Sequence, residues 1–236
     1  MLKKKTIDTG TAVRDNGSGK TGHLFRRGLA ELGIALPEQS ITRLVQYCLE
    51  LAKWNRKVNL VARNTSLEDV VEKHFFDSLT LVPVLENHAP ENALLLDVGS
   101  GAGFPGLVIK AACPRRPVIL LEPRQRRVAF LRHVIRLMAL SGIEVVPHRT
   151  DEQDALPDVH FAVITSRAVA DVTSFLEMVD GLANPGALVI CMQGASGKEQ
   201  WEKEEGNPRF ARVAVEHVRL PFSGANRFIL IFRKKS

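Results

Sequence analysis

Hydrophobic residues recur every three or four positions through the first third of the chain, a spacing that places them on one face of an α-helix. Between Pro37 and Asn55 this face consists of Ile41, Leu44, Val45, Cys48, Leu51 and Ala52. A second helix is predicted after Ser66, where Asp69 can complete a capping arrangement three residues later. Residues 1–22 lack periodicity and are expected to form a flexible arm. Residues 23–90 are therefore predicted to form a helical subdomain.

The pattern changes after Ala93, where short apolar runs alternate with helical stretches. The predicted strands are Leu94–Val98, Val118–Glu122, Ile143–Arg149, Phe161–Arg167, Ala187–Met192, Ala211–Leu220 and Arg227–Arg233. The predicted helices are Gly106–Ala112, Arg124–Leu140, Asp171–Leu182 and Lys198–Glu205. Apolar strands separated by helices indicate a mostly parallel sheet covered on both faces. The last two strands are joined by a link too short for a parallel crossover and should form an antiparallel hairpin. Residues 91–236 are thus predicted to be an α/β domain with a seven-stranded, mostly parallel, Rossmann-like sheet of the methyltransferase type.

A glycine-rich loop follows the first predicted strand. Gly99, Gly101 and Gly103 can adopt backbone conformations closed to other residues, and they allow a ligand to approach the main chain. Ligands of open α/β sheets bind beyond the carboxyl ends of the strands, which is where this loop lies. The loop is therefore the predicted cofactor site.

Two classes of cofactor fit the loop. Residues Gly101–Gly106 match GxGxxG, and Glu122 follows at the distance of a carboxylate that holds a ribose, so a nicotinamide or flavin cofactor is one candidate. Asp97 would repel a pyrophosphate, whereas the cationic S-adenosylmethionine would tolerate or use this carboxylate. This contrast favours S-adenosylmethionine. Asp151, after the third predicted strand, is a candidate acceptor for the adenine amino group.

Four motifs occur in an order that resembles one known family. They are Trp54–Leu60, His74–Leu79, Asp97–Gly106 and Ser166–Ala168. Together they resemble the bacterial small-subunit ribosomal RNA 7-methylguanosine methyltransferases, the glucose-inhibited division protein B family. The resemblance extends from about Leu24 to Lys234. It implies S-adenosylmethionine-dependent methylation of guanine N7 in 16S ribosomal RNA, within the decoding-region loop of the small subunit.

The resemblance also implies which residues contact the cofactor. The family's contacts fall on Gly99, Phe104, Thr150, Asp151 and Arg167, and Glu122 stands where the family has an acidic residue. One departure is Gln193, which occupies a position where the family commonly has lysine. The role of that lysine is therefore in doubt in this chain.

The expected chemistry needs no general base. Guanine N7 carries a lone pair and no proton, so methyl transfer requires only that N7 be positioned in line with the sulfonium methyl group. The sequence is consistent with methylation at N7. Enzymes that act on exocyclic amines carry an Asn/Asp-Pro-Pro-aromatic tetrapeptide after the fourth strand, and this chain has Ser166–Ala168 there instead. No catalytic residue is assigned. His74 and Asp77 are interpreted as a local contact that fixes the helical subdomain to the sheet.

The chain carries a net charge of +6, and one segment accounts for an equal excess. Residues 115–136 contain seven arginines and a single acid, Glu122. The segment is expected to lie beside the cofactor site and to bind RNA phosphates in a salt-dependent way, although a merely solvated face is the alternative. The predicted RNA-binding residues are Arg124, Arg126, Arg127, Arg132, Arg56 and Lys57.

Several classes of protein are excluded. No run approaches 18 uninterrupted apolar residues, which argues against a transmembrane helix. The three cysteines lie far apart without a zinc-binding spacing, so we expect no metal and a reducing, cytoplasmic location. We expect a monomer whose partner is small-subunit ribosomal RNA, naked or assembled. A nicotinamide-dependent oxidoreductase and a non-catalytic RNA-binding module remain the alternatives.

Overall fold

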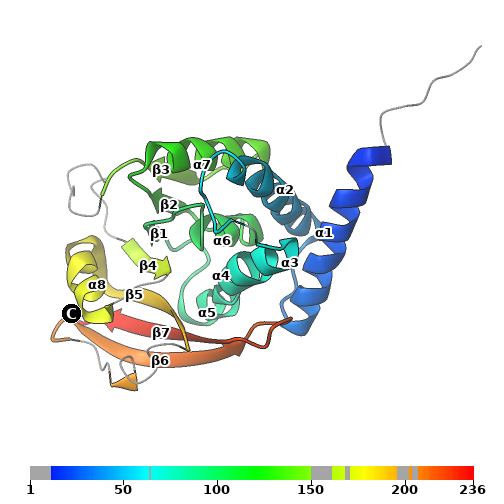
Figure 1. The fold of residues 1–236 in the computed structure, drawn as a ribbon. Helices are drawn as coiled ribbons and strands as arrows, with labels where there is room; N and C mark the ends of the chain where they lie inside the picture. Colours follow the sequence, from blue (N-terminus) through cyan, green and yellow to red (C-terminus); the bar gives the residue numbers. More distant parts are fainter. Residues whose placement is uncertain (1–11, 64, 150–160, 168–170, 196–201, 204–206) are drawn as a thin grey trace, which may run out of the picture.

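The computed structural model describes residues 12–63, 65–149, 161–167, 171–195, 202–203 and 207–236 (Figure 1). These residues form one seven-stranded sheet with the strand order β3-β2-β1-β4-β5-β7-β6. The strands are β1 (Leu95–Val98), β2 (Val118–Leu121), β3 (Ile143–Val146), β4 (Phe161–Arg167), β5 (Ala183–Gly194), β6 (Phe210–Arg219) and β7 (Asn226–Lys234). Strands β1 to β5 pair in parallel, whereas β7 pairs antiparallel with both β5 and β6. The predicted mostly parallel sheet with a terminal hairpin is confirmed.

Helices precede and separate the strands. Those before the sheet are α1 (Ala12–Glu31), α2 (Glu38–Asn55), α3 (Leu67–Val70), the π-helical segment η1 (Val71–Phe76), α4 (Asp77–Leu79) and α5 (Leu81–His88). Those within the sheet region are α6 (Gly106–Ala112), α7 (Gln125–Leu137), α8 (Val172–Val179) and the 3₁₀ turn η3 (Asp180–Leu182). Most of the predicted helix Lys198–Glu205 lies outside the described residues, as do residues 1–11 of the predicted arm.

Residues 12–22 differ from the expected flexible arm, because they form the first half of α1. The helix is held by contacts with residues far along the chain, and the local sequence pattern does not predict these contacts. Phe25 packs edge-on against Phe75 and Phe76. Gly28 permits the close approach, since a Cβ atom there would lie 2.2 Å from the Phe76 ring. Figure 1 shows α1 running along the outer side of the other amino-terminal helices.

The two faces of the sheet pack against different layers. On one face Leu95, Leu120 and Ile190 join a hydrophobic core that includes α6, α7 and the amino-terminal helices. On the other face Leu96 and Val189 pack with α8. Successive residues of a strand point to opposite faces, which explains why neighbours such as Leu95 and Leu96 enter different cores. The amino-terminal helices therefore share one continuous core with the sheet.

Polar contacts also tie these helices to the terminal hairpin. The buried Glu72 of η1 accepts hydrogen bonds from the backbone N–H groups of Phe222 and Ser223 through Oε1, at 2.7 Å each. Asp77 of α4 accepts one from Arg227 Nε of β7 at 2.9 Å. Among the described helices, none is long and apolar enough to cross a membrane.

Replacing Glu72 by alanine should lower the free energy of unfolding by about 1–3 kcal/mol, because two backbone N–H groups lose their acceptor. Urea denaturation followed by circular dichroism measures the change. The control is Glu68→Ala, four residues earlier, where an exposed carboxylate pairs with Arg27. That exposed pair should be worth less than about 1 kcal/mol. Equal losses in the two variants would contradict the role assigned to Glu72.

Candidate functional site

The glycine-rich loop leaves the carboxyl end of β1 with three glycines in the left-handed region. Their φ angles are +70° at Gly99, +60° at Gly101 and +99° at Gly103. A Cβ atom at Gly99 would meet nothing within 4 Å, and one at Gly101 would find its nearest neighbour at 3.6 Å. At Gly103 it would lie 2.6 Å from Tyr47 Oη. Packing therefore requires Gly103, whereas the backbone at Gly99 and Gly101 remains open to a ligand.

Asp97 fixes the far end of the loop. Its Oδ2 accepts a hydrogen bond of 2.9 Å from the backbone N–H of Gly106, the first residue of α6. The side chain is fully buried, and Oδ1 has no hydrogen-bond partner in the described part of the chain. Burial raises the pKa of this carboxyl group to about 6. Asp97 thus holds the loop while keeping one carboxylate oxygen uncommitted.

Glu122 follows β2 and reaches the glycine loop from the neighbouring strand. It is buried, and its Oε2 accepts a hydrogen bond of 2.8 Å from Gly101 N. Its Oε1 accepts another of 2.9 Å from Arg124 N, and Arg127 Nη1 lies 3.6 Å from Oε2. The structure thus brings Asp97, Glu122 and the glycines together, as the sequence predicted. Each carboxylate oxygen of Glu122 retains lone pairs beyond the bonds it accepts.

Phe104 of the glycine loop packs against the amino-terminal helices. Its ring stacks between Tyr47 of α2, at a centroid distance of 5.6 Å, and His74 of η1, at 5.0 Å. Phe75 packs edge-on at 5.2 Å, and only 2% of Phe104 is exposed. The side chain therefore presents no surface for a cofactor, and the contact expected at this position is left to the backbone. Tyr47 Oη donates a hydrogen bond to the carbonyl oxygen of Ala102, which clamps the loop from the same side.

Arg167 ends β4 and is held by the amino-terminal helices. Its Nη1 donates to His74 Nδ1 at 2.7 Å and to the Lys73 carbonyl oxygen at 3.1 Å. The same nitrogen lies 3.9 Å from Asp77 Oδ2. Burial, aided by the charge of Arg167, lowers the pKa of His74 to about 3, so the imidazole is neutral and its Nδ1 can accept. His74 and Asp77 therefore connect these helices to the sheet by engaging Arg167.

The residues that sequence reasoning missed are Tyr47 and Arg227. Tyr47 sits within the apolar stripe of α2 and so resembled an ordinary core position. Asp77 interacts with both Arg227 and Arg167. The local sequence does not predict the contact with Arg227, because 150 residues separate Arg227 from Asp77. The only local signal was the charged Asp77 within the helical motif His74–Leu79.

The predicted RNA-binding residues gather around α7. Arg124 and Arg126 are exposed at its beginning, beside Glu122, while Arg127 is half-buried. Arg132 is exposed, and its Nη2 donates to the Val145 carbonyl oxygen at 3.4 Å. Arg56 and Lys57 are exposed at the end of α2. That helix end contacts α7, because the Trp54 ring lies 5.5 Å from Phe130 and 5.3 Å from His133.

Two of the seven arginines do not flank the loop as expected. Arg115 and Arg116 precede β2, so they lie at the opposite edge of the parallel strands from the glycine loop. Arg116 is buried, and its Nη1 donates to the Ala93 carbonyl oxygen at 3.2 Å. Arg115 pairs with Glu91. Both are occupied by contacts with the segment that enters β1.

Some predicted positions fall elsewhere. Thr150 and Asp151 lie outside the described residues. Gln193 lies in β5 opposite Phe228 of β7. No group of three or more potential metal ligands occurs in the part of the chain that the structure describes.

Asp97→Asn should flatten the pH dependence of stability. The unfolded chain ionises Asp97 near its ordinary pKa of 3.8, whereas the folded chain holds the proton until about pH 6. The free energy of unfolding therefore falls as pH rises between these values. The asparagine oxygen can still accept from Gly106 N, so the variant should lose this fall, which is about 3 kcal/mol at about 1.4 kcal/mol per pKa unit.

Urea denaturation between pH 4 and pH 7 measures the profiles. Asp69→Asn is the control, because this exposed carboxylate has a pKa lowered by its hydrogen bond with Lys73 and should leave the fall in place. Parallel profiles for Asp97→Asn and the wild type would contradict the assignment.

Two solved structures share the fold of this chain. TrmN from Thermus thermophilus aligns with a TM-score of 0.53 and 17% identity over 66% of this chain and 48% of its own. The ribosomal protein L11 methylase from Lactobacillus delbrueckii subsp. bulgaricus aligns with a TM-score of 0.53 and 14% identity, covering 70% of this chain and 79% of its own. At such identities the likeness establishes the fold alone.

Sequence relatives are closer. The ribosomal RNA small subunit methyltransferase G of Desulfotalea psychrophila is 42% identical over 213 residues, which cover 88% of this chain and 95% of the relative. The protein of the same name from Geobacter metallireducens is 34% identical over 90% of this chain and 96% of its own. The family model described as rRNA small subunit methyltransferase G matches residues 40–229. With the glycine loop, Glu122 and the seven-stranded sheet in place, the chain belongs to the rRNA small subunit methyltransferase G family.

Proposed function

We propose that this protein transfers a methyl group from S-adenosylmethionine to N7 of a guanine in small-subunit ribosomal RNA. The observation that carries the proposal is the open backbone at Gly99 and Gly101 beside the buried carboxylate of Glu122. Glycines at positive φ suit a ligand that approaches the main chain, and Gly99 has free space where a Cβ atom would lie. The relatives are named as ribosomal RNA small subunit methyltransferases, which supports the class of substrate.

The residues at the loop fit S-adenosylmethionine. Glu122 would accept the ribose hydroxyls with the lone pairs that Gly101 and Arg124 leave free, as carboxylates at this position do for ribose in related sheets. The negative charge of Asp97 favours a cation, and its Oδ1 lacks a partner among the described residues. A pyrophosphate would be repelled by Asp97, which disfavours a nicotinamide cofactor. When bound, S-adenosylmethionine supplies an electrophilic methyl group on a sulfonium centre.

The residues of the chain would act by positioning. Guanine N7 needs no proton removed, so no general base is required. Arg167 uses Nη1 for its contacts with His74 and Lys73, and its other N–H groups would hold guanine O6. A donor on O6 orients the base while it leaves the N7 lone pair free to attack. The neutral His74 adds no charge that would oppose the cationic methyl donor.

The exposed cations would hold the RNA. Arg124 and Arg126 begin α7 beside Glu122, so phosphates bound there would lie next to the loop. Guanidinium groups bind phosphate through paired N–H donors, and such contacts weaken as the salt concentration rises. We further propose that the protein works as a monomer in the cytoplasm.

Methyl transfer with labelled S-adenosylmethionine tests the proposal. The substrates are small subunits and naked 16S RNA from a strain that lacks the modification. N7-methylguanosine is located by reduction followed by aniline cleavage of the RNA. We expect label in one nucleotide that becomes a cleavage site. Folded protein that labels no nucleotide would overturn the methyltransferase proposal, and label without cleavage would overturn the N7 assignment.

Gly99→Ala should weaken cofactor binding while the protein stays folded. An alanine at φ +70° costs about 1–2 kcal/mol of strain, and its Cβ atom meets no protein atom within 4 Å. It would instead occupy the space offered to the ligand. We expect the dissociation constant for S-adenosylmethionine, measured by calorimetry, to rise at least about tenfold, a loss of about 1.4 kcal/mol.

Gly186→Ala is the matched control. Gly186 has a φ of +78° and equally open surroundings, but it lies near the start of β5, at the opposite edge of the sheet. The two variants should lose similar stability, and only Gly99→Ala should lose cofactor affinity. Unchanged affinity in Gly99→Ala would refute the assignment of the loop.

A further inference from the structure

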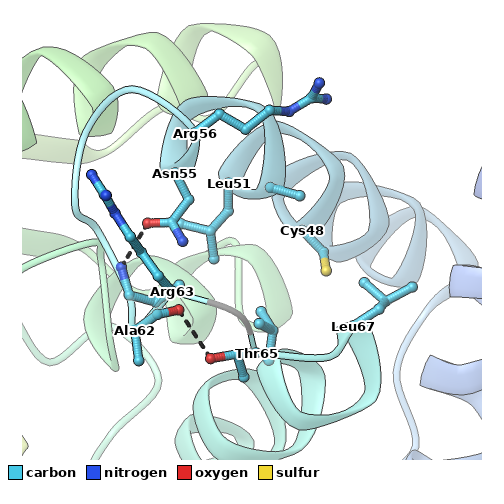
Figure 2. Close-up of a pocket in the computed structure, with 11 residues that line it drawn as sticks. Cys48, Leu51, Asn55, Arg56, Ala62, Arg63, Thr65 and Leu67 are labelled. Carbon is cyan, nitrogen blue, oxygen red and sulfur yellow. Dashed lines mark hydrogen bonds between the residues drawn. The ribbon is translucent and has the colours of Figure 1, made fainter.

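A pocket lies between the end of α2, the following loop and α3, and the glycine loop does not line it (Figure 2). Its volume is about 480 Å³, which is within the range of about 300–1,000 Å³ typical of small-molecule sites. The interior is apolar and is formed by Cys48, Leu51, Val61, Leu67 and Val70. Burial raises the pKa of Cys48 to about 12, so its thiol is neutral at pH 7.

Asn55 presents hydrogen-bond donors at this pocket. Its Oδ1 accepts hydrogen bonds from the backbone N–H groups of Leu60 at 2.9 Å and Val61 at 3.0 Å. These two bonds fix the orientation of the amide, because the nitrogen end could not accept from them. The Nδ2 group therefore faces away from the loop backbone, and within the described chain it has no acceptor. Its two N–H donors are available to a ligand rich in acceptors.

Two arginines complete the polar rim. Arg63 lies alongside Asn55, and Arg56 extends outward from the same rim (Figure 2). Arg63 Nε donates to Asn59 Oδ1 at 2.9 Å, and neither guanidinium has a carboxylate partner among the described residues. The acids nearest to the pocket in sequence are already neutralised. Glu68 pairs with Arg27 at 3.1 Å, and Asp69 pairs with Lys73.

An apolar interior with a donor-rich, cationic rim matches one chemical class. A ligand that combines an apolar body with an anionic group rich in acceptors fits this lining, and a nucleotide has both. Leu67 supports this, because a leucine that is 41% exposed at the pocket leaves apolar surface uncovered. Unpaired bases of RNA are bound in this way, with the base on apolar or aromatic groups and the phosphate on cations.

We propose that this pocket binds an unpaired nucleotide of the RNA substrate, with its base against Val61 and Leu67 and its phosphate on Arg63. Arg56 would hold the next phosphate along the strand. The source of the nucleotide rests on the proposed function, whereas the affinity for nucleotides rests on the pocket itself. The pocket and the cofactor loop are linked by α2, because Cys48 follows Tyr47, which clamps Ala102. A strand bound here could continue toward the arginines of α7, because the end of α2 contacts α7 through Trp54 and Phe130.

The first experiment measures nucleotide binding to the full-length protein. Uridine and adenosine 5′-monophosphate are titrated while the methyl NMR signals of Leu51, Val61 and Leu67 are followed, with ribose 5-phosphate and inorganic phosphate as comparison ligands. The proposal expects nucleotides to shift these signals at lower concentrations than either comparison ligand. Equal binding of inorganic phosphate would reduce the site to an anion site and overturn the proposal, as would the absence of any shift.

The second experiment measures methyl transfer by Arg63→Gln and Leu67→Gln. Both residues are exposed, so both variants should fold, which circular dichroism checks. We expect the KM for the RNA substrate to rise about tenfold in each, with kcat and the affinity for S-adenosylmethionine unchanged. Arg233→Gln is the control, because Arg233 is exposed near the opposite edge of the sheet.

The two experiments separate two kinds of failure. Unchanged KM in both variants would overturn the RNA-binding role of the pocket. A wild type that binds nucleotides but methylates no RNA would overturn the proposed function and leave the pocket in place. A change in kcat or in cofactor affinity would show that the substitutions disturb the cofactor loop and would contradict the proposal of a separate binding site.

Discussion

The geometry of the candidate site depends on the stack of Phe104 between Tyr47 and His74. Phe104 belongs to the glycine loop, whereas Tyr47 and His74 come from helices that precede the sheet. Stacked and edge-on aromatic rings stabilise one another beyond the area they bury. The hydrogen bond from Tyr47 to Ala102 adds a directional constraint to the same loop. The amino-terminal helices are therefore part of the candidate site and not an appendage to it.

Three buried carboxylates stabilise the glycine loop and its contacts with the neighbouring elements. Asp97 anchors the start of α6, Glu122 joins the loop to the start of α7, and Asp77 joins β7 to Arg167. Buried charges persist only where hydrogen bonds or opposite charges offset their desolvation. Glu122 and Asp77 have such partners on both sides, whereas Asp97 has one hydrogen bond through Oδ2 and burial raises its pKa. The three carboxylates thereby connect the glycine loop to α6 and α7, and the end of β4 to α4.

Helix α2 serves two surfaces at once. Tyr47 faces the glycine loop, whereas Cys48, Leu51 and Asn55 line the pocket at the end of α2. Successive residues of a helix are rotated by about 100°, so adjacent positions can serve different faces. The same helix ends against α7 through Trp54. A nucleotide held in the pocket would thus be placed by the element that also positions the cofactor loop.

The local sequence pattern was sufficient to predict the strands of the sheet and the glycine loop. The period of the apolar runs marked the strands, the short link marked the hairpin, and the glycines with Glu122 marked the loop and its partner. Pattern was insufficient wherever a side chain's environment came from distant parts of the chain. It did not reveal the helix before Gly22, the burial of Phe104 or the burial of Arg116.

The sequence by itself therefore determined which elements form and which edge of the sheet carries the chemistry. Periodicity and backbone freedom are properties of neighbouring residues, and they can be interpreted without the rest of the molecule. Only the tertiary structure decided which side chains remain free to meet a ligand. Arg167 commits Nη1 to His74 and the Lys73 carbonyl oxygen, while Arg56 and Arg63 stay without a carboxylate partner in the described chain. Such partnerships depend on long-range packing, which brings together residues that are far apart along the chain.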